Sequence, residues 1–203
     1  MAGIARVGII GSGPLGRAVA GHAVAAGLPV FMSNSRGPDS LSAVVADLGP
    51  LATAVPVADA AAADLVVLAI PFVKVPELTA VTDWSGRVIV DATNQFAEYA
   101  PYSGFVDLGD ETGSEWVARQ LPGATVIKAF NAMFAASIAA DPRHAQGRQV
   151  VFYAGDDASS NAEFADLLER FGFAPVYLGS LREGGRLMQL GGPLSGLHVL
   201  KQD

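Results

Sequence analysis

The chain contains no cysteine, which excludes disulfide bonds, cysteine–zinc sites and thiol redox chemistry. It has only three histidines, His22, His144 and His198, and none stands near a carboxylate at a spacing typical of catalysis or of a metal site. Its apolar runs are of strand length, too short to cross a bilayer, and the first residues lack the pattern of a signal sequence. These absences predict a soluble cytoplasmic protein without a metal site.

Charge is also scarce. Charged residues make up 16% of the 203 residues and hydrophobic ones 51%, a balance typical of a folded globular domain. The formal net charge is -7, which argues against nucleic acid or an anionic membrane surface as a partner. The expected partner is therefore a small molecule, and the sequence leaves open whether the chain forms a homodimer.

Glycine, by contrast, is placed in a clear pattern near the start. An apolar run from Ile4 to Ile10 leads into Gly11-Ser12-Gly13-Pro14-Leu15-Gly16, and small residues typical of a helix follow. This is a G-x-G-x-x-G pattern in the strand–turn–helix context that dinucleotide binding requires. Gly11 permits a tight turn, Gly13 lets the backbone approach a pyrophosphate, and Gly16 lets the helix pack on the strand. The alternative is a tight turn without a ligand.

The next strand indicates which dinucleotide binds. Leu28–Met32 runs into Ser33-Asn34-Ser35-Arg36, and no Asp or Glu lies between Gly11 and Asp39. An NAD site normally has such an acid about 20 residues past the glycines, on the ribose 2′-hydroxyl. Amide, hydroxyl and guanidinium donors instead suit a 2′-phosphate, so Asn34, Ser35 and Arg36 predict NADP(H). The alternative is that Arg36 is an exposed turn residue.

Strand and helix patterns alternate along most of the chain. Near-continuous Val/Ile runs predict strands buried on both faces, hence a parallel sheet covered by helices. We therefore expect an α/β fold, a doubly wound Rossmann-type parallel sheet with a small C-terminal α/β extension. Residues 1–131 would form the NADP-binding domain, and residues 132–203 a small C-terminal region that completes an acceptor cleft.

The expected strands are Ile4–Ile10, Leu28–Met32, Thr53–Val57, Leu65–Ile70, Val88–Ala92, Thr125–Ala129, Val150–Ala154 and Pro175–Leu178. The expected helices are 14–26, 39–48, 58–63, 73–82, 114–121, 158–171 and 181–190. Two capping boxes, Thr112-x-x-Glu115 and Ser160-x-x-Glu163, are predicted to start helices.

Residues that follow the strands are the site candidates, because ligands bind at the carboxyl ends of the strands in such a sheet. Ile70 and Pro71 end one strand, Asn94 follows the next, and Ala129 and Asn131 end a third. Asn131 could hydrogen-bond a carboxamide or a heterocycle. Lys128 could be a structural ion-pair partner or a ligand for acidic groups, and Phe72 could face a ring or belong to the core.

The segment from Asn94 to about Glu111 is predicted to be a long irregular loop. Loops of that length in a compact domain are usually functional lids or disordered, and this one is rich in aromatic residues. It either covers a flat ring system or packs on the domain. Its aromatic residues are Phe96, Tyr99, Tyr102 and Phe105.

No residue is predicted to act as a catalytic acid or base. The acidic cluster Asp107, Asp110, Glu111 and Glu115 is better explained as a solvated loop and helix start. Hydride transfer between two flat redox rings fits this pattern, because the protein supplies orientation and the cofactors supply the chemistry.

Together these motifs resemble the NADP oxidoreductase, coenzyme F420-dependent family. The resemblance rests on Gly8–Gly16, Ser33–Pro38, Ala69–Pro71, Val90–Asn94 and Val126–Asn131, and continues at Gly184–Arg186 and Gly191–Leu194. The family's archetype transfers hydride between NADPH and a 5-deazaflavin, and the reductase domains of six-transmembrane metalloreductases are related to it.

The resemblance also implies roles for single residues. Ser12 and Leu15 would line the pyrophosphate, and Ser35 and Arg36 the 2′-phosphate. Ile70, Pro71, Ala129 and Asn131 would lie on the nicotinamide side. Coenzyme F420 or a flavin would be the second substrate, in a cleft beside the C-terminal region.

Three other interpretations of the sequence stay open, of which one, a ferric reductase that uses free flavin, is a variant of the leading hypothesis. A small β-hydroxyacid or imino-acid reductase shares the first half, but such enzymes usually carry a larger helical C-terminal domain. An NADPH-binding sensor or regulatory module without turnover would explain the missing acid and base equally well.

Overall fold

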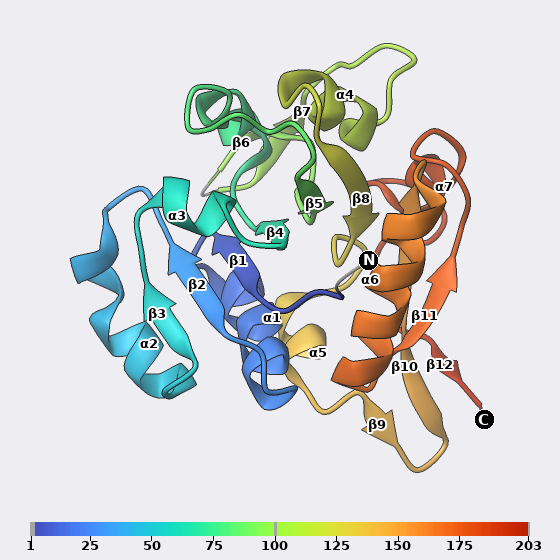
Figure 1. Ribbon diagram of the computed structural model, residues 1–203. Coiled ribbons are helices and arrows are strands. Elements are labelled where there is room, and N and C mark those ends of the chain that lie inside the picture. The colour runs from blue at the N-terminus through green and yellow to red at the C-terminus, as the bar shows by residue number, and fades with distance from the viewer. Residues whose placement is uncertain (1–2, 100, 203) are drawn as a thin grey trace.

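The computed structural model describes residues 3–99 and 101–202, and its centre is one mostly parallel sheet (Figure 1). The strand order is β11-β10-β8-β5-β4-β1-β2-β3, and β9 and β12 pair with β10. The strands are β1 Val7–Ile10, β2 Val30–Ser33, β3 Ala52–Ala54, β4 Leu65–Leu68, β5 Val88–Asp91, β6 Phe96–Glu98, β7 Ser103–Phe105, β8 Thr125–Ala129, β9 Arg143–His144, β10 Gly147–Gly155, β11 Ala174–Tyr177 and β12 Leu200–Lys201.

Helices cover both faces of this sheet (Figure 1). They are α1 Pro14–Ala25, α2 Ser42–Leu48, α3 Val57–Ala61, α4 Gly113–Gln120, α5 Ala135–Ala139, α6 Ala158–Phe171 and α7 Glu183–Met188, with the 3-10 helices η1 Pro38–Leu41 and η2 Phe72–Leu78. Buried side chains of α1, α2, α5 and α6 form one core cluster against the strands. Those of α3, η2 and α4 form a second cluster with other strand residues. The architecture is thus a Rossmann-type α/β fold, as the sequence predicts.

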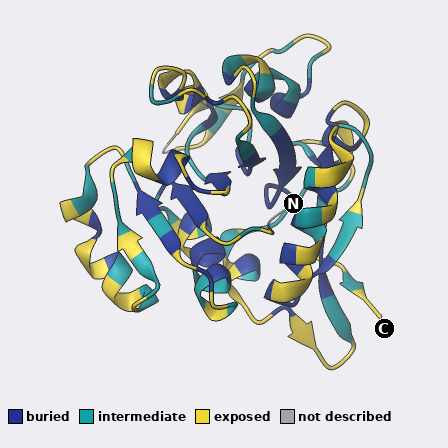
Figure 2. Cartoon of the chain, in the orientation of Figure 1, coloured by how far each residue is buried: buried dark blue, intermediate teal, exposed yellow. Residues whose placement is uncertain are grey.

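The central strands are buried from both sides, which explains their apolar sequences. All four residues of β1 and of β4 are buried. Burial on both faces is expected of a parallel strand between two helical layers. In Figure 2 these strands are dark blue, and exposed residues lie mainly on the helices and loops around them.

The parallel strands end in register, and this alignment positions the site. Ile10 pairs with Ser33 on one side and Leu68 on the other, Leu68 pairs with Asp91, and Asp91 pairs with Lys128. The segments that follow β1, β2, β4, β5 and β8 therefore leave the sheet along one edge. β1 lies between β2 and β4, which is the point where the strand order reverses and where ligands bind in such sheets.

The C-terminal part of the chain extends the same sheet. β10 pairs antiparallel with β8, and β11 pairs parallel with β10. The long strand β10 also pairs with the short strands β9 and β12. The β-α-β unit formed by β10, α6 and β11 is the element predicted over residues 150–178. The division at residue 131 remains a proposal about organisation.

Three local predictions are wrong. The segment predicted as a helix over 73–82 is the 3-10 helix η2, because Pro76 lies inside it and cannot donate a backbone hydrogen bond. Ser160 does not start α6, whose cap is Asp157, since the Asp157 side chain accepts a hydrogen bond from the Ser160 N–H. The predicted irregular loop contains the antiparallel hairpin β6–β7, and Ala100 within it lies outside the described residues.

The Thr112 capping box is confirmed. The Thr112 side chain accepts from the Glu115 N–H, and the Glu115 carboxylate accepts from the Thr112 N–H at 2.7 Å. Among the described residues, no helix is long and apolar enough to cross a membrane.

Candidate functional site

The glycine loop between β1 and α1 shows why each glycine is needed. Gly11 has a φ of +117°, which disfavours any side chain, and a Cβ there would overlap the Ala69 carbonyl of the β4 edge. A Cβ on Gly16 would overlap the Gly11 carbonyl oxygen. A Cβ on Gly13, by contrast, would meet no protein atom within 4 Å. Two glycines therefore serve packing, and the third leaves a space that the protein itself does not fill.

The first turn of α1 faces this space without a cap of its own. Its N-cap residue Gly13 has no side chain to accept from the helix N–H groups, and no acidic residue lies in the first turn. Pro14 occupies the first helical position, where its missing N–H costs little. Free N–H groups and the positive end of the helix dipole favour an anion here. Ser12 and Leu15 are half-buried at this loop, and their contact with a pyrophosphate remains a prediction.

The turn after β2 is braced by one amide. Asn34 Nδ2 donates to Ser12 Oγ at 3.2 Å and to Ser40 Oγ at 3.0 Å. Asn34 Oδ1 accepts from the Arg36 N–H at 2.9 Å. Asn34 thus ties the glycine loop to the turn that presents Ser35 and Arg36. Any contact from Asn34 to a ligand remains a prediction, since its two amide hydrogens already have partners.

Ser35 and Arg36 are exposed at this turn, beside the glycine loop. Among the described residues, no side chain pairs with the Arg36 guanidinium. The residues present therefore fit a dinucleotide phosphate: a space at Gly13, an uncapped helix start and a free cation, with no nearby acid of the kind that NAD sites use.

The edge after β4 gives an apolar wall. Ile70 and Pro71 are half-buried there, and Ile70 packs against the core cluster below it. Phe72 is only 2% exposed and packs against Trp116, with ring centroids 4.4 Å apart. Phe72 is therefore a core residue, while Ile70 and Pro71 stay candidates for contact with a nicotinamide ring.

Two amides meet across the ends of β5 and β8. Asn131 Nδ2 donates to Asn94 Oδ1 at 3.2 Å and to the Met188 carbonyl at 2.7 Å, and Asn94 Nδ2 donates to the Asn131 carbonyl at 3.3 Å. Asn131 is 7% exposed and Ala129 is fully buried. The structure thus brings together Asn94 and Asn131, which the sequence separates by 37 positions, and links both to the C-terminal segment.

The side-chain oxygen of Asn131 has no hydrogen-bond donor among the described residues. Both of its amide hydrogens have partners, while its Oδ1 is buried without a donor. The residue before it, Phe130, has a φ of +63°, the left-handed value that non-glycine residues rarely adopt. Such backbone strain concentrates at functional sites. Neither feature has a signal in the sequence, because a phenylalanine gives no hint of a left-handed turn.

Lys128 is a structural ion-pair partner. Its Nζ lies 3.0 Å from Asp91 Oδ2, and the two side chains are 4% and 0% exposed. The sequence singles out Lys128 but gives Asp91 no role. The sequence has no local signal for this pair, because only the alignment of two neighbouring strands brings Lys128 and Asp91 to the same position.

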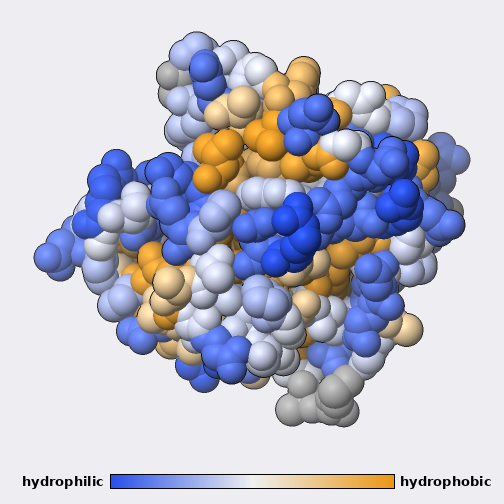
Figure 3. Space-filling model, turned by 90° about the horizontal axis from the view of Figure 1, so that it is seen from above, coloured by the Kyte–Doolittle hydropathy of each residue, from blue (hydrophilic) through white to orange (hydrophobic). Residues whose placement is uncertain are grey.

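The hairpin β6–β7 carries an aromatic cluster. The Phe96 ring lies 4.9 Å from Tyr102 and 5.9 Å from Phe105, and Tyr99 contacts Tyr102 edge-on. Three of these side chains are more than half exposed: Tyr99, Tyr102 and Phe105. On the face viewed from above, apolar side chains gather in a band between hydrophilic ones (Figure 3). The hairpin is ordered by its own ring contacts, and its role as a lid remains a prediction.

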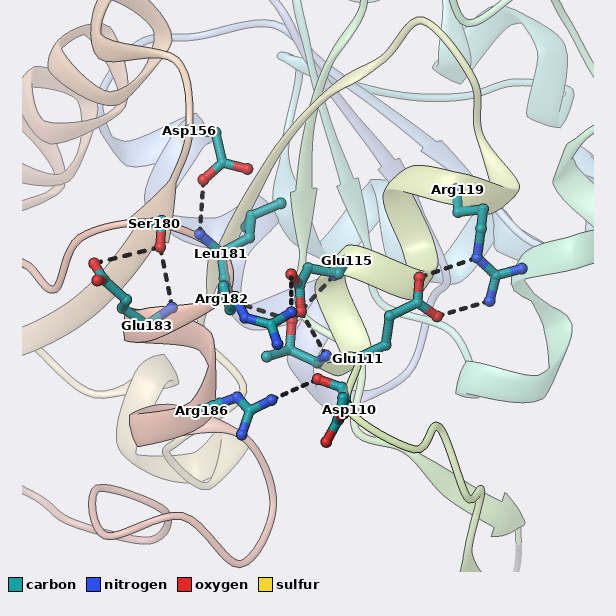
Figure 4. Close-up of polar contacts among 11 residues, drawn as sticks. Asp110, Glu111, Glu115, Arg119, Asp156, Ser180, Leu181, Arg182, Glu183 and Arg186 are labelled. Carbon is teal, nitrogen blue, oxygen red and sulfur yellow. Dashed lines mark hydrogen bonds and ion pairs between the residues drawn. The ribbon is translucent and has the colours of Figure 1, made fainter.

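Hydrogen bonds and an ion pair connect the start of α4 to the segment around α7 (Figure 4). Thr112 Oγ1 donates to the Leu181 carbonyl at 3.1 Å, and Arg186 donates to the Asp110 carbonyl at 2.5 Å. Arg182 lies 3.4 Å from the Glu115 carboxylate. These contacts fix the C-terminal segment against the end of the hairpin region.

The contacts of Glu111 and of the three histidines give none of them a catalytic partner among the described residues. A bidentate hydrogen bond from Arg119 lowers the pKa of the partly exposed Glu111 carboxyl, which favours its ionised form. His22 Nε2 contacts the Ile138 carbonyl and its ring packs on Phe173, while His144 and His198 are exposed. Among the described residues, no group of three or more His, Cys, Asp or Glu could hold a metal ion.

The fold and the open glycine loop define a dinucleotide-binding protein of the Rossmann class. The family described as NADP oxidoreductase, coenzyme F420-dependent, matches residues 6–95. A crystal structure of the hypothetical protein SMa0349 from Sinorhizobium meliloti shares 40% identity and a TM-score of 0.91, over 98% of this chain and 97% of that one. Residues 6–95 thus belong to this family of NADP oxidoreductases.

Two further relatives agree with this assignment. A crystal structure named as a candidate F420-dependent NADP reductase from Arthrobacter sp. FB24 shares 26% identity and a TM-score of 0.75, over 89% of this chain and 88% of that one. Metalloreductase STEAP3 of Rattus norvegicus is 27% identical over 179 residues, which are 87% of this chain and 34% of that protein. This chain thus spans about a third of the length of that curated relative.

Proposed function

We propose that this chain transfers a hydride between NADP(H) and a flat two-electron acceptor, a 5-deazaflavin or a flavin. The observation that carries the proposal is the contrast along one sheet edge. One end offers an open glycine loop and a free guanidinium, and the other offers neutral amides, with the buried charges beneath them paired to each other. Such a site can bind phosphates and orient rings without a protein acid or base.

When bound, NADPH would supply the hydride, and the acceptor ring would take it with a proton from solvent. The chain's own residues would do three things. The α1 N-terminus and Gly13 would bind the pyrophosphate, and Arg36 the 2′-phosphate. Ile70, Pro71 and Asn131 would fix the nicotinamide plane. Holding two rings in reacting geometry supplies most of the rate in this kind of reaction.

The family name and the Arthrobacter neighbour support coenzyme F420 as one acceptor. The name of the metalloreductase relative supports a variant in which a metal ion is the final acceptor, and in our proposal a free flavin would pass electrons to a ferric chelate. Both acceptors use the same nucleotide half, so only a direct comparison of acceptors separates them.

Stopped-flow measurement of NADPH oxidation at 340 nm against F420, FMN, FAD and a ferric chelate tests the proposal. We expect oxidation by at least one ring acceptor. Asn131→Leu should lower the rate more than it lowers NADPH affinity, because Asn131 lies at the ring end and not at the phosphates. His144→Ala is the control and should leave the rate unchanged.

Two results would contradict the proposal. Tight NADPH binding with no oxidation by any acceptor would support a sensor or regulatory module. Loss of oxidation in a histidine variant would support a reductase that needs a protein acid, such as a β-hydroxyacid or imino-acid reductase.

A further inference from the structure

The buried ion pair lies directly next to the two amides of the site. Lys128 and Asp91 are register partners at the last aligned position of β8 and β5, and Asn131 and Asn94 follow three residues later on the respective strands. An apolar pair of similar size would hold two strands together at least as well, because burying two charges costs nearly as much as their attraction returns. The pair therefore calls for a role besides stability.

The hydrogen bonds that the ion pair makes to its neighbours indicate this role. Asp91 Oδ1 accepts from the Thr93 N–H at 2.9 Å and from Thr93 Oγ1 at 2.6 Å. Lys128 Nζ donates to the Thr93 carbonyl at 2.5 Å. Asp91 Oδ2 also accepts from Ser114 Oγ at 2.6 Å, which ties the network to the first turn of α4. Thr93 is thus held at its N–H, its hydroxyl and its carbonyl.

These contacts constrain the backbone just before each of the two asparagines. Thr93 precedes Asn94, so holding the Thr93 backbone sets where the Asn94 side chain starts. On the other strand, Phe130 is left-handed and its ring is fixed edge-on against Phe164 and Phe173. A non-glycine residue keeps such a conformation only where its surroundings over-determine it. Lys128 on one side and the Asn131 hydrogen bonds on the other provide that constraint.

We propose that the Lys128–Asp91 pair is a positioning device. It holds Thr93, and through Thr93 and the Phe130 turn it sets the Asn94–Asn131 amides against the nicotinamide ring of NADPH. The inference rests on the proposed function for the identity of the ring. Lys128, Asp91 and Thr93 are positioning residues, because they act through the two asparagines.

Comparing the affinities of two ligands distinguishes an effect on ring positioning from a general effect on folding. NADPH and 2′-phospho-ADP-ribose share every phosphate, and only NADPH carries the nicotinamide. The ratio of their dissociation constants therefore measures what the ring contributes. We expect the wild-type protein to bind NADPH more tightly by about fivefold or more, the order of one net hydrogen bond.

Thr93→Val is the main variant, because valine keeps the shape and removes only the hydroxyl bond to Asp91. We expect the ratio to fall toward one, with the affinity for 2′-phospho-ADP-ribose unchanged. Thr93→Ser keeps the hydroxyl and should restore the wild-type ratio. The double variant Lys128→Met with Asp91→Asn removes both charges together, avoids leaving one buried charge alone, and should act as Thr93→Val does.

A destabilised control separates these effects from a general loss of stability. Leu167→Ala removes a 2%-exposed core side chain of α6 and should lower the melting temperature while leaving the ratio intact. Where an acceptor is found, Thr93→Val should also lower kcat by about tenfold, a larger change than the roughly fivefold loss of NADPH affinity, as expected when bound rings are misaligned.

The outcomes are distinct. A wild-type ratio of one, or equal losses for both ligands in Thr93→Val, would overturn the positioning role and leave the pair as structure only. Failure of every acceptor in the stopped-flow assay would overturn the proposed function alone, because the ligand ratio is measured without turnover.

Discussion

Helices α1 and α4 both begin at the carboxyl edge of the sheet, and their first turns are completed in different ways. The first turn of α4 is closed by its own chain, since Thr112 and Glu115 cap each other's backbone groups. The first turn of α1 has no capping side chain and no acid. A helix start that the protein completes serves stability, and one that it leaves open serves an external anion.

Two cations of the site, Lys128 near the amides and Arg36 near the glycine loop, differ in the same way: the protein itself neutralises one and leaves the other open. Lys128 is buried and paired with Asp91, whereas Arg36 is exposed, and no described side chain pairs with it. Substitutions at the nucleotide end should therefore change ligand affinity, and substitutions at the amide end should change stability and ring geometry. Each prediction below tests one side of this comparison.

The largest effect is expected at Lys128. Lys128→Met leaves the Asp91 carboxylate buried without its cation, and breaking such a pair typically costs about 3–5 kcal/mol of unfolding free energy. Chemical denaturation followed by circular dichroism measures the change. Arg36→Ala, at the exposed cation, should stay within about 0.5 kcal/mol of the wild-type value. Equal losses of unfolding free energy in the two variants would mean that the buried, paired cation contributes no more to stability than the exposed one.

The next effect is steric and concerns Gly13. Gly13→Val should weaken NADPH binding by at least about 100-fold, or about 2.7 kcal/mol, because its methyl groups fill the space left for the pyrophosphate. The fold should survive, since a Cβ at this position meets no protein atom within 4 Å. Fluorescence titration and thermal melting measure both properties.

Two glycines of the same helix region serve as controls for Gly13. Gly21 also has open space at its Cβ position but lies further along α1, so Gly21→Val should leave NADPH affinity unchanged. Gly16→Ala should lower the melting temperature, because its Cβ would overlap the Gly11 carbonyl. Undiminished NADPH binding by a folded Gly13→Val protein would place the phosphates elsewhere.

A smaller effect is expected at Arg36. Arg36→Ala should weaken NADPH binding by about 1.5–3 kcal/mol, the usual worth of hydrogen bonds to a charged group, and should leave NADH binding unchanged. Titration of both nucleotides tests this, with the exposed Arg170→Ala on α6 as the control. A loss shared by NADH would mean that Arg36 does not contact the 2′-phosphate.

The smallest effect concerns the cap of α6 and depends on pH. Hydrogen bonds from the backbone and side chain of Ser160 lower the pKa of the exposed Asp157 carboxyl. A lowered folded-state pKa contributes stability above the ordinary aspartate value, and this is lost as the pH falls through the folded-state value. The melting temperature of Asp157→Asn should therefore lie below that of the wild type at neutral pH, and the gap should close below about pH 4.

The matched control for this cap is Asp166→Asn, an exposed aspartate further along the same helix. It should change the melting temperature equally little at neutral and acid pH. A gap for Asp157→Asn that does not vary with pH would mean that the carboxylate charge contributes nothing to the cap.

The geometry of the glycine loop can be predicted from the sequence, because the constraints there are local. The three glycines, the strand before them and the Ser35–Arg36 turn follow one another within about 30 residues, and their roles come from backbone sterics that any chain obeys. The amide end depends on pairs far apart in sequence, such as Asn94 with Asn131 and Lys128 with Asp91. Periodicity predicts the strands that carry these residues, but only the strand order brings the side chains together.

Where local rules failed, a competing local interaction was the reason. Asp157 caps α6 three residues before Ser160, because its side chain accepts from the Ser160 N–H and so places Ser160 inside the first turn of the helix. Pro76 converts the expected helix after β4 into a 3-10 helix. The hairpin β6–β7 went unpredicted because its strands are only three residues each and contain glycine and alanine.

The central place of β1 in the sheet also has a consequence for synthesis on the ribosome. Its two neighbours, β2 and β4, are complete by residue 68, so the whole nucleotide loop and its supporting strands leave the ribosome within the first third of the chain. The partner of β8 on its other side, β10, is made only at residues 147–155, and the Met188 carbonyl that holds Asn131 comes later still. The glycine loop and its strands can therefore form on a nascent chain well before the Asn94–Asn131 amide pair and its Met188 contact are complete.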